Sequence, residues 1–412
     1  MASLLQFTVG NYRSFLIERT FSMMPNSIQD APKECVVAEG RYKYLTAAAV
    51  YGANSSGKSN LVMALAAMKK MVLNSVKLND YDLLLYDPFL LKEGTGNQAT
   101  HFEIVYLDVD ETRIRYGFNY TPRRIEREWL FISKRNKKEQ PYFVRDEEGI
   151  GVDETLFAEG VSLEERTNDN RLFLSLVAQL GGAISKDVLD FFNSGYTVIS
   201  GLSSRGYEGF TEKQFLNEEA ESVDALQFFK DLQLGFVDIE TAEREIEKGR
   251  KAIDVFTMHN VYNRDGEITG KQRFRFEYCE SQGTQKLFEL AGPLFETLRH
   301  GRLLVMDELD AKMHPLISQH IIKLFSNEKT NPHHAQLLFT THDTNLLSSH
   351  LLRRDQIWFT EKDKTESTDL YSLMHIVLPD GTKPRGDGNL ERNYIKGRYG
   401  AIPYLQTIEQ PL

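Results

Sequence analysis

The chain has 412 residues, of which 41% are hydrophobic and 26% are charged, and its net charge is −10. This length allows roughly two or three domains, and the negative charge argues against a surface that coats nucleic acid generally. Two cysteines, Cys35 and Cys279, give no disulfide framework, which fits a reducing cytoplasm. The first residues lack a signal-peptide pattern and no stretch of about 18 apolar residues occurs, so we expect a cytoplasmic protein that does not span a membrane.

The first third of the sequence predicts strands and one helix. Residues 6–15 read as a strand that runs into a turn, and residues 46–50 as a buried strand followed by a helix from Leu61. Three further stretches alternate apolar and polar residues with period two, at 101–107, 113–120 and 127–133. This alternation predicts an antiparallel meander.

Residues 51–60, YGANSSGKSN, contain a phosphate-binding loop pattern between the 46–50 strand and the helix. The glycines allow a tight turn that directs backbone N–H groups at phosphate oxygens, and the helix N-terminus attracts the same anion. Lys58 is expected to reach the β- and γ-phosphates of ATP, and the Ser59 hydroxyl to ligate Mg²⁺. The expected nucleotide contacts are Gly52, Asn54, Ser55, Ser56, Gly57, Lys58, Ser59 and Asn60. A chance match is the alternative, but the flanking strand and helix argue against it.

The middle of the chain, residues 156–252, changes character and predicts a helical insertion. We expect helices at 170–180, at 188–192 and from Glu218 to Lys251, whose charged part after Glu240 reads as a solvated face. The apolar runs 191–192 and 226–229 make the insertion a candidate surface for a partner or for oligomerisation. The alternative is that these aromatic residues pack within the insertion.

Strands alternate with helices again near the C-terminus, which predicts a parallel sheet. An apolar strand at 303–306 ends in Asp307, expected to hold Mg²⁺, and Glu308, expected to polarise the attacking water. A second buried strand at 337–341 is followed by His342, which resembles the switch histidine of ABC-type ATPases, a residue that contacts the γ-phosphate. Structural acids at a strand end and a structural histidine are the alternatives.

Residues 280–286, ESQGTQK, resemble the signature segment of ABC-type ATPases. There a helix N-terminus with Ser and Gly, here Ser281 and Gly283, is aimed at the γ-phosphate held by the opposite subunit. The alternative for Ser281 is a plain helix N-cap. Residues 11–15, NYRSF, resemble the opening of SMC, RecF and OLD-type ATPases, where the arginine, here Arg13, approaches the nucleotide. The alternative for Arg13 is a surface arginine. The glutamine that senses Mg²⁺ in such ATPases has no clear counterpart.

Together with the tail segments 353–363 and 394–403, these motifs resemble the stand-alone prokaryotic ABC/SMC-like ATPases of the RloA/AbiL abortive-infection type, to which the ATPase subunit of the PARIS anti-phage system is related. The resemblance implies an α/β fold, an ABC-type P-loop ATPase head with a mixed sheet, an antiparallel meander and a helical insertion. The head is expected to comprise residues 1–155 and 253–412, with the insertion at 156–252.

The favoured hypothesis is an ATP-hydrolysing, Mg²⁺-dependent sensor or scaffold of a bacterial anti-phage defence system. We expect a homodimer or a higher homo-oligomer, a separately encoded nuclease or toxin as effector, a possible phage-encoded trigger, and no nuclease activity in this chain. The main alternative is an SMC/RecF-like DNA-binding ATPase in DNA repair. It would use the basic residues Arg123, Arg124, Arg127, Lys134, Arg135, Lys137 and Lys138. An ATP-driven assembly or transport module is a weaker third hypothesis.

Overall fold

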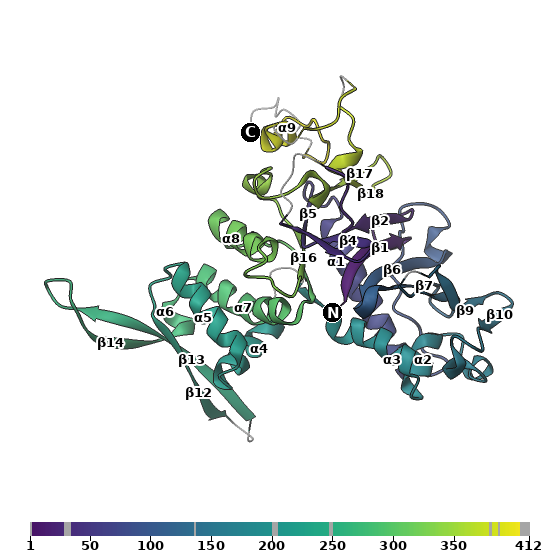
Figure 1. Ribbon diagram of the computed structural model, residues 1–412, viewed down its shortest axis with the longest axis horizontal. Coiled ribbons are helices and arrows are strands. Elements are labelled where there is room, and N and C mark those ends of the chain that lie inside the picture. Colours follow the sequence, from purple (N-terminus) through teal and green to yellow (C-terminus); the bar gives the residue numbers. More distant parts are fainter. Residues whose placement is uncertain are drawn as a thin grey trace, which may run out of the picture.

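The computed structural model describes residues 2–28, 34–135, 137–199, 205–246, 250–378, 381–385 and 388–403. Two sheets with helices between and beside them form the body, and a three-stranded sheet extends from it (Figure 1). None of the helices within these ranges is both long and apolar enough to cross a membrane.

The predicted meander is part of a seven-stranded antiparallel sheet in the order β10-β9-β8-β7-β6-β1-β2. Its alternating residues, such as Phe102 and Ile104, are fully buried on one face. The strands are β1 (Ser3–Gly10), β2 (Arg19–Ser22), β6 (Thr100–Asp108), β7 (Thr112–Tyr120), β8 (Ile125–Ser133), β9 (Gln140–Asp146) and β10 (Gly149–Val152). A separate hairpin joins β3 (Val36–Glu39) to β4 (Tyr42–Leu45).

The predicted parallel sheet has six strands in the order β11-β15-β16-β5-β17-β18, and only the β17–β18 pair is antiparallel. Parallel pairing brings the carboxyl ends of β5, β15 and β16 to one edge, where ligands bind in open α/β sheets. The strands are β5 (Ala47–Tyr51), β11 (Tyr196–Ile199), β15 (Leu303–Met306), β16 (Gln336–Thr340), β17 (Ile357–Lys362) and β18 (Thr368–Ser372).

Alternate residues of the parallel strands face two cores. Ala48 and Val50 of β5 pack with α1 and the meander, whereas Ala47 and Ala49 pack on the side of α7 and α8. The first core also receives α2 and α3, and the second receives α4, α5 and α9. The helices are α1 (Lys58–Asn74), α2 (Phe173–Gln179), α3 (Ala183–Asp190), α4 (Arg205–Leu216), α5 (Ala220–Asp231), α6 (Phe276–Cys279), α7 (Gln282–His300), α8 (Pro315–Ser326) and α9 (Leu390–Ile395).

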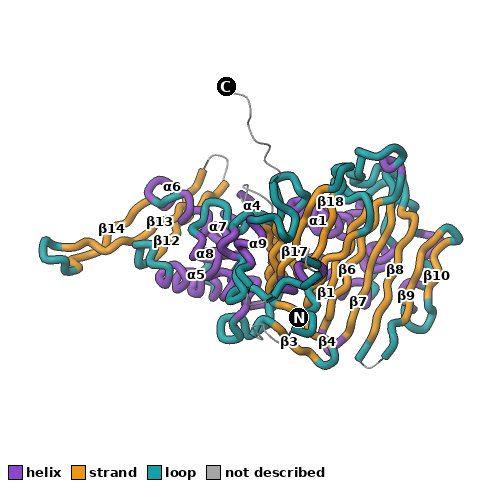
Figure 2. Tube along the Cα trace, turned by 90° about the horizontal axis from the view of Figure 1, so that it is seen from above, coloured by secondary structure: helices purple, strands orange, loops and turns teal. Residues whose placement is uncertain are grey.

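The helix expected from Glu218 to Lys251 is wrong beyond Asp231. Asp238–Ile246 forms β12, which pairs with β13 (Arg250–Tyr262), and β13 pairs with β14 (Ile268–Arg275). The charged side chains, which would suit the surface of a helix, form ion pairs between neighbouring strands instead. Glu243 of β12, for example, pairs with Lys251 of β13 at 2.6 Å. Tertiary pairing thus overrides helix propensity in this three-stranded arm, which extends from the body (Figure 2).

The aromatic runs of the middle segment form no exposed apolar surface. Phe191 is 4% exposed and stacks on Tyr106 of the meander with ring centroids 3.8 Å apart. Phe229 is 1% exposed and stacks on Phe288 of α7. These residues therefore join the middle segment to the two main cores, and β11 adds a strand to the parallel sheet.

Candidate active site

The loop between β5 and α1 turns sharply at two glycines. Gly57 has a φ of +109°, and a β-carbon there would lie 2.2 Å from Thr368 Oγ1. A β-carbon on Gly52 would lie 2.5 Å from the carbonyl oxygen of Thr360. The backbone approaches its neighbours so closely at both positions that only glycine, which has no side chain, fits there. Since α1 begins at Lys58, its positive N-terminus faces the loop.

Hydroxyl groups from separate segments hold this loop in place. The Ser56 and Thr360 hydroxyls lie 2.7 Å apart, and the Thr368 hydroxyl donates to the Ser56 carbonyl at 2.9 Å. Ser14 lies 2.7 Å from Thr368 Oγ1 and accepts a hydrogen bond from the Asn60 amide, also at 2.7 Å. The loop is thus fixed by β17, β18 and the N-terminal NYRSF segment.

Lys58 is buried beneath the loop. Its Nζ donates to the carbonyl oxygens of Gly52 (2.9 Å) and Ala53 (3.1 Å). Burial lowers the pKa of Lys58 to about 8, and the carboxylates of Asp307 and Glu308 oppose this shift. A phosphate in the loop would offer Lys58 a stronger, charge-assisted partner than these carbonyls.

The two acids follow β15 at the carboxyl edge of the sheet. Asp307 is buried, its N–H donates to the Ile199 carbonyl at 2.9 Å, and its Oδ1 accepts a hydrogen bond from the Thr340 hydroxyl at 2.6 Å. Glu308 has a φ of +55°, and its N–H donates to Thr340 Oγ1 at 2.8 Å. Hydroxyl and carboxylate oxygens are donors that Mg²⁺ prefers, so Ser59 and Asp307 fit this ion.

His342 lies two residues beyond the end of β16. Its backbone N–H is 3.4 Å from both carboxylate oxygens of Asp310, in the turn after the acid pair. Partial burial, followed by the charge of Lys58, lowers the pKa of His342 below its ordinary value. The imidazole is therefore neutral at neutral pH and can donate one hydrogen bond and accept another.

A cavity of about 650 Å³ adjoins the loop. Loop residues 52–56 form one side, His342 forms another, and residues of the C-terminal segment 394–403 close it together with Glu361 and Lys362 of β17. The Thr344 hydroxyl donates to Glu391 at 2.8 Å and so links the segment after His342 to α9. The structure thus brings the phosphate-binding loop and His342 together.

Ser281 and Gly283 lie at the start of α7. Ser281 is exposed and caps the helix, since its Oγ accepts from the Thr284 N–H at 3.1 Å. A β-carbon on Gly283 would lie 3.0 Å from the carbonyl oxygen of Lys312, in the turn after the acid pair. Neither residue lines the loop cavity among the residues described there. A role towards a nucleotide bound by the same chain is therefore not supported by this geometry.

Arg13 pairs with Asp87 at 2.6 Å and lies over the Tyr12 ring. The NYRSF segment bonds to α1 through three of its residues. The Arg13 guanidinium donates to the Met63 sulfur, the Tyr12 hydroxyl donates to the Met63 carbonyl at 3.4 Å, and Ser14 Oγ accepts from the Asn60 amide. Contact between Arg13 and a nucleotide stays a prediction. Gln98 is the next glutamine after the loop helix and would have to fill the role of the glutamine that senses Mg²⁺. It is exposed, and its backbone carbonyl accepts a hydrogen bond from the Asn11 amide at 2.6 Å. No residue is assigned to that role.

The sequence did not reveal the residues that orient the acids. The carbonyl of Ile199 and the hydroxyl of Thr340 reach Asp307 because β11 and β16 flank β15. The only available signal was a hydroxyl residue at the end of the strand before His342.

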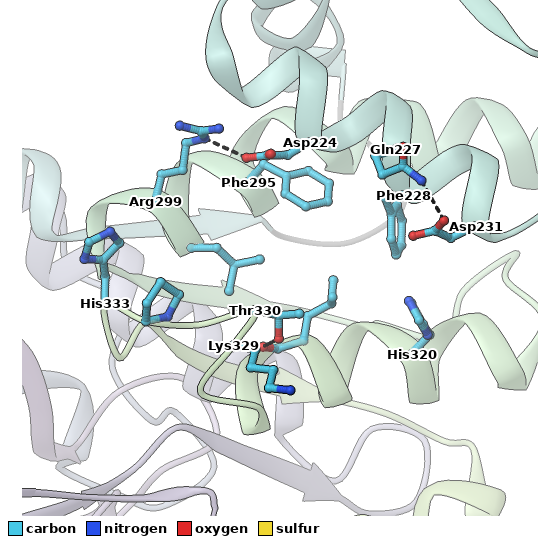
Figure 3. A pocket seen from close by; sticks show the side chains of 13 residues that line it. Asp224, Gln227, Phe228, Asp231, Phe295, Arg299, His320, Lys329, Thr330 and His333 are labelled. Atoms are coloured by element: carbon cyan, nitrogen blue, oxygen red, sulfur yellow. Dashed lines mark hydrogen bonds and ion pairs between the residues drawn. The ribbon is translucent and has the colours of Figure 1, made fainter.

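A second cavity, of about 390 Å³, lies among α5, α7, α8 and the loop after α8 (Figure 3). Phe228 and Phe295 supply apolar surface, and the His320 ring stacks on Phe228 with centroids 5.6 Å apart. At its rim Arg299 pairs with Asp224 at 2.6 Å. None of the loop, acid or signature residues lines this cavity, so it is separate from the cavity beside the phosphate-binding loop.

A sequence model of the family described as "AAA domain, putative AbiEii toxin, Type IV TA system" matches residues 47–348, which is more than half of the chain. The chain belongs to this AAA family. Its fold class is the one expected, an α/β ABC-type P-loop ATPase head. No curated protein matches the chain.

Solved structures with detectable likeness include two of the recombination mediator protein RecF in the RecFOR pathway, titled RecF-ATPrS and RecF-ATP. They are 12% and 13% identical, with TM-scores of 0.36 and 0.37, and each alignment covers 90% of this chain and 98% of the other. The family assignment rests on the sequence match and the site geometry.

Proposed function

We propose that this AAA-family chain binds and hydrolyses ATP, and that it acts as the sensor or scaffold of a bacterial anti-phage defence system. The observation that carries the ATPase proposal is convergence: the phosphate-binding loop, Lys58, the acid pair and His342 meet at one edge of the parallel sheet. This edge is where α/β folds bind their ligands.

In the proposed reaction each residue has a distinct role. The loop N–H groups and the N-terminus of α1 bind the phosphates, and Lys58 neutralises charge at the β- and γ-phosphates. Ser59 and Asp307 would hold Mg²⁺, which when bound offsets charge on the phosphate oxygens. Glu308 accepts a proton from the attacking water, and the neutral His342 donates a hydrogen bond to the γ-phosphate.

We further propose that a second copy of the chain completes this site. The exposed N-terminus of α7, with Ser281 and Gly283, is free of the loop cavity of its own chain and suits an anion presented by a facing copy. The proposed assembly is a homodimer with two equivalent sites, and higher homo-oligomers remain compatible with it.

Glu308→Gln tests the reaction. It should retain ATP binding, lower turnover by at least about a hundredfold because the base is lost, and accumulate closed dimer. Glu218→Gln is a matched control, since Glu218 is an exposed glutamate with a similar φ of +52°. ATP binding by titration, phosphate release and light scattering give the readouts. Normal turnover in Glu308→Gln would refute its role as base.

The defence role rests on the family description, which names a putative AbiEii toxin and a type IV toxin–antitoxin system. We propose that this chain controls a separately encoded nuclease or toxin and binds it through the middle segment, 156–252. Because its two aromatic runs are buried, the contact must use exposed side chains, such as Val223 on α5, which is 64% exposed.

Co-purification with the product of the neighbouring gene tests this proposal. Val223→Asp should release the effector without changing ATP turnover, whereas Val109→Asp, on the meander and 54% exposed, should not. Nuclease activity in the highly pure chain alone, retained in Glu308→Gln and lost in a variant outside the ATP site, would refute the need for a separate effector.

The alternative, a SMC/RecF-like DNA-binding ATPase, depends on a basic surface. Arg124 and Arg127 line a surface hollow together with Glu126, Asp146, Glu147 and Glu148. Acidic side chains therefore outnumber basic ones around these two arginines, which disfavours a phosphate-binding groove there. Salt-dependent binding of duplex DNA that is lost in Arg124→Ala/Arg127→Ala would favour the alternative.

A further inference from the structure

We propose that Thr340 is a positioning residue for ATP hydrolysis, because one hydroxyl group orients both acids of the site. This inference rests on the ATPase function proposed above. It assigns a residue that touches neither nucleotide nor water in that mechanism but fixes the two side chains that do.

The pairing of two strands places Thr340 beside the acids. β15 and β16 are parallel and Met306 pairs with Phe339, so the residues that follow these two in the chain, Asp307 and Thr340, meet at the carboxyl edge. The Thr340 side chain is completely buried. Its position and its surroundings are therefore set by the sheet and not by solvent.

The Thr340 hydroxyl uses both of its hydrogen-bonding capacities. It donates to Asp307 Oδ1 at 2.6 Å and accepts from the Glu308 N–H at 2.8 Å. The carbonyl oxygen of Thr340 accepts from the next amide, Leu309 N–H, at 3.0 Å. Three successive residues after β15 are thus bound to one residue of β16.

These bonds have different consequences for the two acids. Asp307 has one carboxylate oxygen committed to the hydroxyl, so its rotamer is fixed and ion binding falls to the other oxygen. Glu308 adopts a φ of +55°, which is costly for a residue other than glycine. The bonds to Glu308 N–H and Leu309 N–H hold the chain in this conformation and so set the direction of the Glu308 side chain.

Only residues with a hydroxyl group reproduce this arrangement. Serine can donate and accept as threonine does, whereas valine has the same shape as threonine but can do neither. The pair Thr340→Ser and Thr340→Val therefore separates the hydrogen bonds from the packing.

The experiment measures kcat, KM for ATP, and the Mg²⁺ concentration that gives half-maximal rate. Thr340→Val should lower kcat at least tenfold and raise the half-saturating Mg²⁺ at least threefold, while metal-free binding of a fluorescent ATP analogue stays within twofold. Thr340→Ser should stay within threefold of the unmodified chain in every parameter. A change in the Mg²⁺ dependence without a change in metal-free binding would not result from general destabilisation of the fold.

Thr211→Val is the matched control. Thr211 is also completely buried, and its hydroxyl donates to the Glu289 carbonyl at 3.2 Å and accepts from the Gly292 N–H at 3.1 Å, between α4 and α7. It should leave the Mg²⁺ dependence unchanged. If Thr340→Val does not fold, Thr340→Cys replaces it, since a thiol is a weak donor of similar size.

An unchanged kcat and Mg²⁺ dependence in Thr340→Val would overturn the proposal, as would equal defects in the serine and valine variants. No turnover by the unmodified chain would refute the ATPase proposal instead. In that case the Mg²⁺ dependence of analogue binding decides the role of Thr340, with the same expected order of variants.

Discussion

At the scale of single residues, Lys58 shows how the loop is prepared for an anion. Its ammonium group is buried against two loop carbonyls, and burial lowers its pKa to about 8. A bound triphosphate favours the charged form, so its binding must raise this pKa. Lys58→Ala should weaken ATP binding by about tenfold or more, since a charge-assisted contact is lost. Equilibrium titration measures this, and unchanged affinity would exclude the loop as the nucleotide site.

The lowered pKa of Lys58 also predicts a pH dependence. ATP binding near pH 8 should take up protons, and the affinity should fall as pH rises through about 8, because the neutral lysine must first be protonated. The stability of the free protein changes with pH in the opposite direction. The unfolded chain binds the Lys58 proton more tightly than the folded chain, so the contribution of Lys58 to stability rises between about pH 8 and 10.5.

Calorimetry in two buffers of different ionisation enthalpy detects the proton uptake, and Lys58→Ala should abolish it. Lys69→Ala is the control: Lys69 also lies on α1 and burial also lowers its pKa, but its Nζ donates to the Tyr196 carbonyl instead of the loop. Proton uptake that persists in Lys58→Ala would contradict the prediction.

Sequence spacing predicted the loop, Asp307, Glu308 and His342 because each lies on one continuous strand–turn segment. It could not predict Ile199, Thr340, Thr360 or Thr368, whose roles depend on which strands are neighbours in the sheet. Nor could it show that Ser14, next to the more conspicuous Arg13, accepts a hydrogen bond from Asn60 of α1.

At the scale of elements, a buried glutamate joins the meander to the middle segment. Glu128 of β8 is completely buried and accepts from the N–H groups of Phe173 (2.7 Å) and Leu174 (3.1 Å) and from the Tyr116 hydroxyl (2.9 Å). Burial raises its pKa, while Arg145 and these hydrogen bonds oppose the shift. A side chain of the meander thus satisfies the free N–H groups at the start of α2.

Glu128→Ala should therefore lower the free energy of unfolding by about 2–4 kcal/mol, because two helix N–H groups and a tyrosine hydroxyl lose their buried acceptor. Glu128→Gln keeps one acceptor oxygen and should lose less. Urea denaturation provides the measurement, and Glu126→Ala, on the same strand but partly exposed, is the control. A loss below about 0.5 kcal/mol in Glu128→Ala would contradict this account.

The elements that sequence predicted well are those whose pattern is local. Residues 113–120 alternate apolar and other residues along β7, residues 101–104 do so at the start of β6, and α1 follows the loop without interruption. β12 was missed because Glu240, Glu243 and Arg244 favour a helix locally, whereas their cross-strand partners lie in β13 and β14. β11 is only four residues long, and its parallel pairing with β15 cannot be read from its own sequence.

At the scale of the whole molecule, the middle segment is part of the ATPase body and not a removable insertion. It supplies β11 to the parallel sheet and aromatic side chains to both cores. Its deletion would expose both cores, so a partner site on it must be tested by surface substitutions. The arm formed by β12–β14 is also bonded to the residue that precedes the α7 cap. Glu280, directly before Ser281, accepts hydrogen bonds from Thr257 at 2.8 Å and His259 at 3.0 Å, both on β13.

The proposed dimer predicts complementation between two inactive variants. Lys58→Ala disables the loop half of a site, and Ser281→Arg blocks the α7 half. Ser281 is exposed, so its replacement costs the fold only the hydrogen bond that caps α7. If each site combines the loop of one copy with α7 of the other, a mixed dimer contains one doubly defective and one intact site. A random mixture should then recover about a quarter of the turnover of the unmodified chain, since half the dimers are mixed and each has one working site of two.

Mixing Lys58→Ala with Asp307→Asn provides the control, because both changes fall in the same half and each site of the mixed dimer keeps one defect. This mixture should remain inactive. Recovery only in the first mixture would show that Ser281 acts on the nucleotide of the facing copy. Equal inactivity of both mixtures, in samples whose subunits are shown to exchange, would place Lys58 and Ser281 in the same half of the site and contradict the proposed dimer.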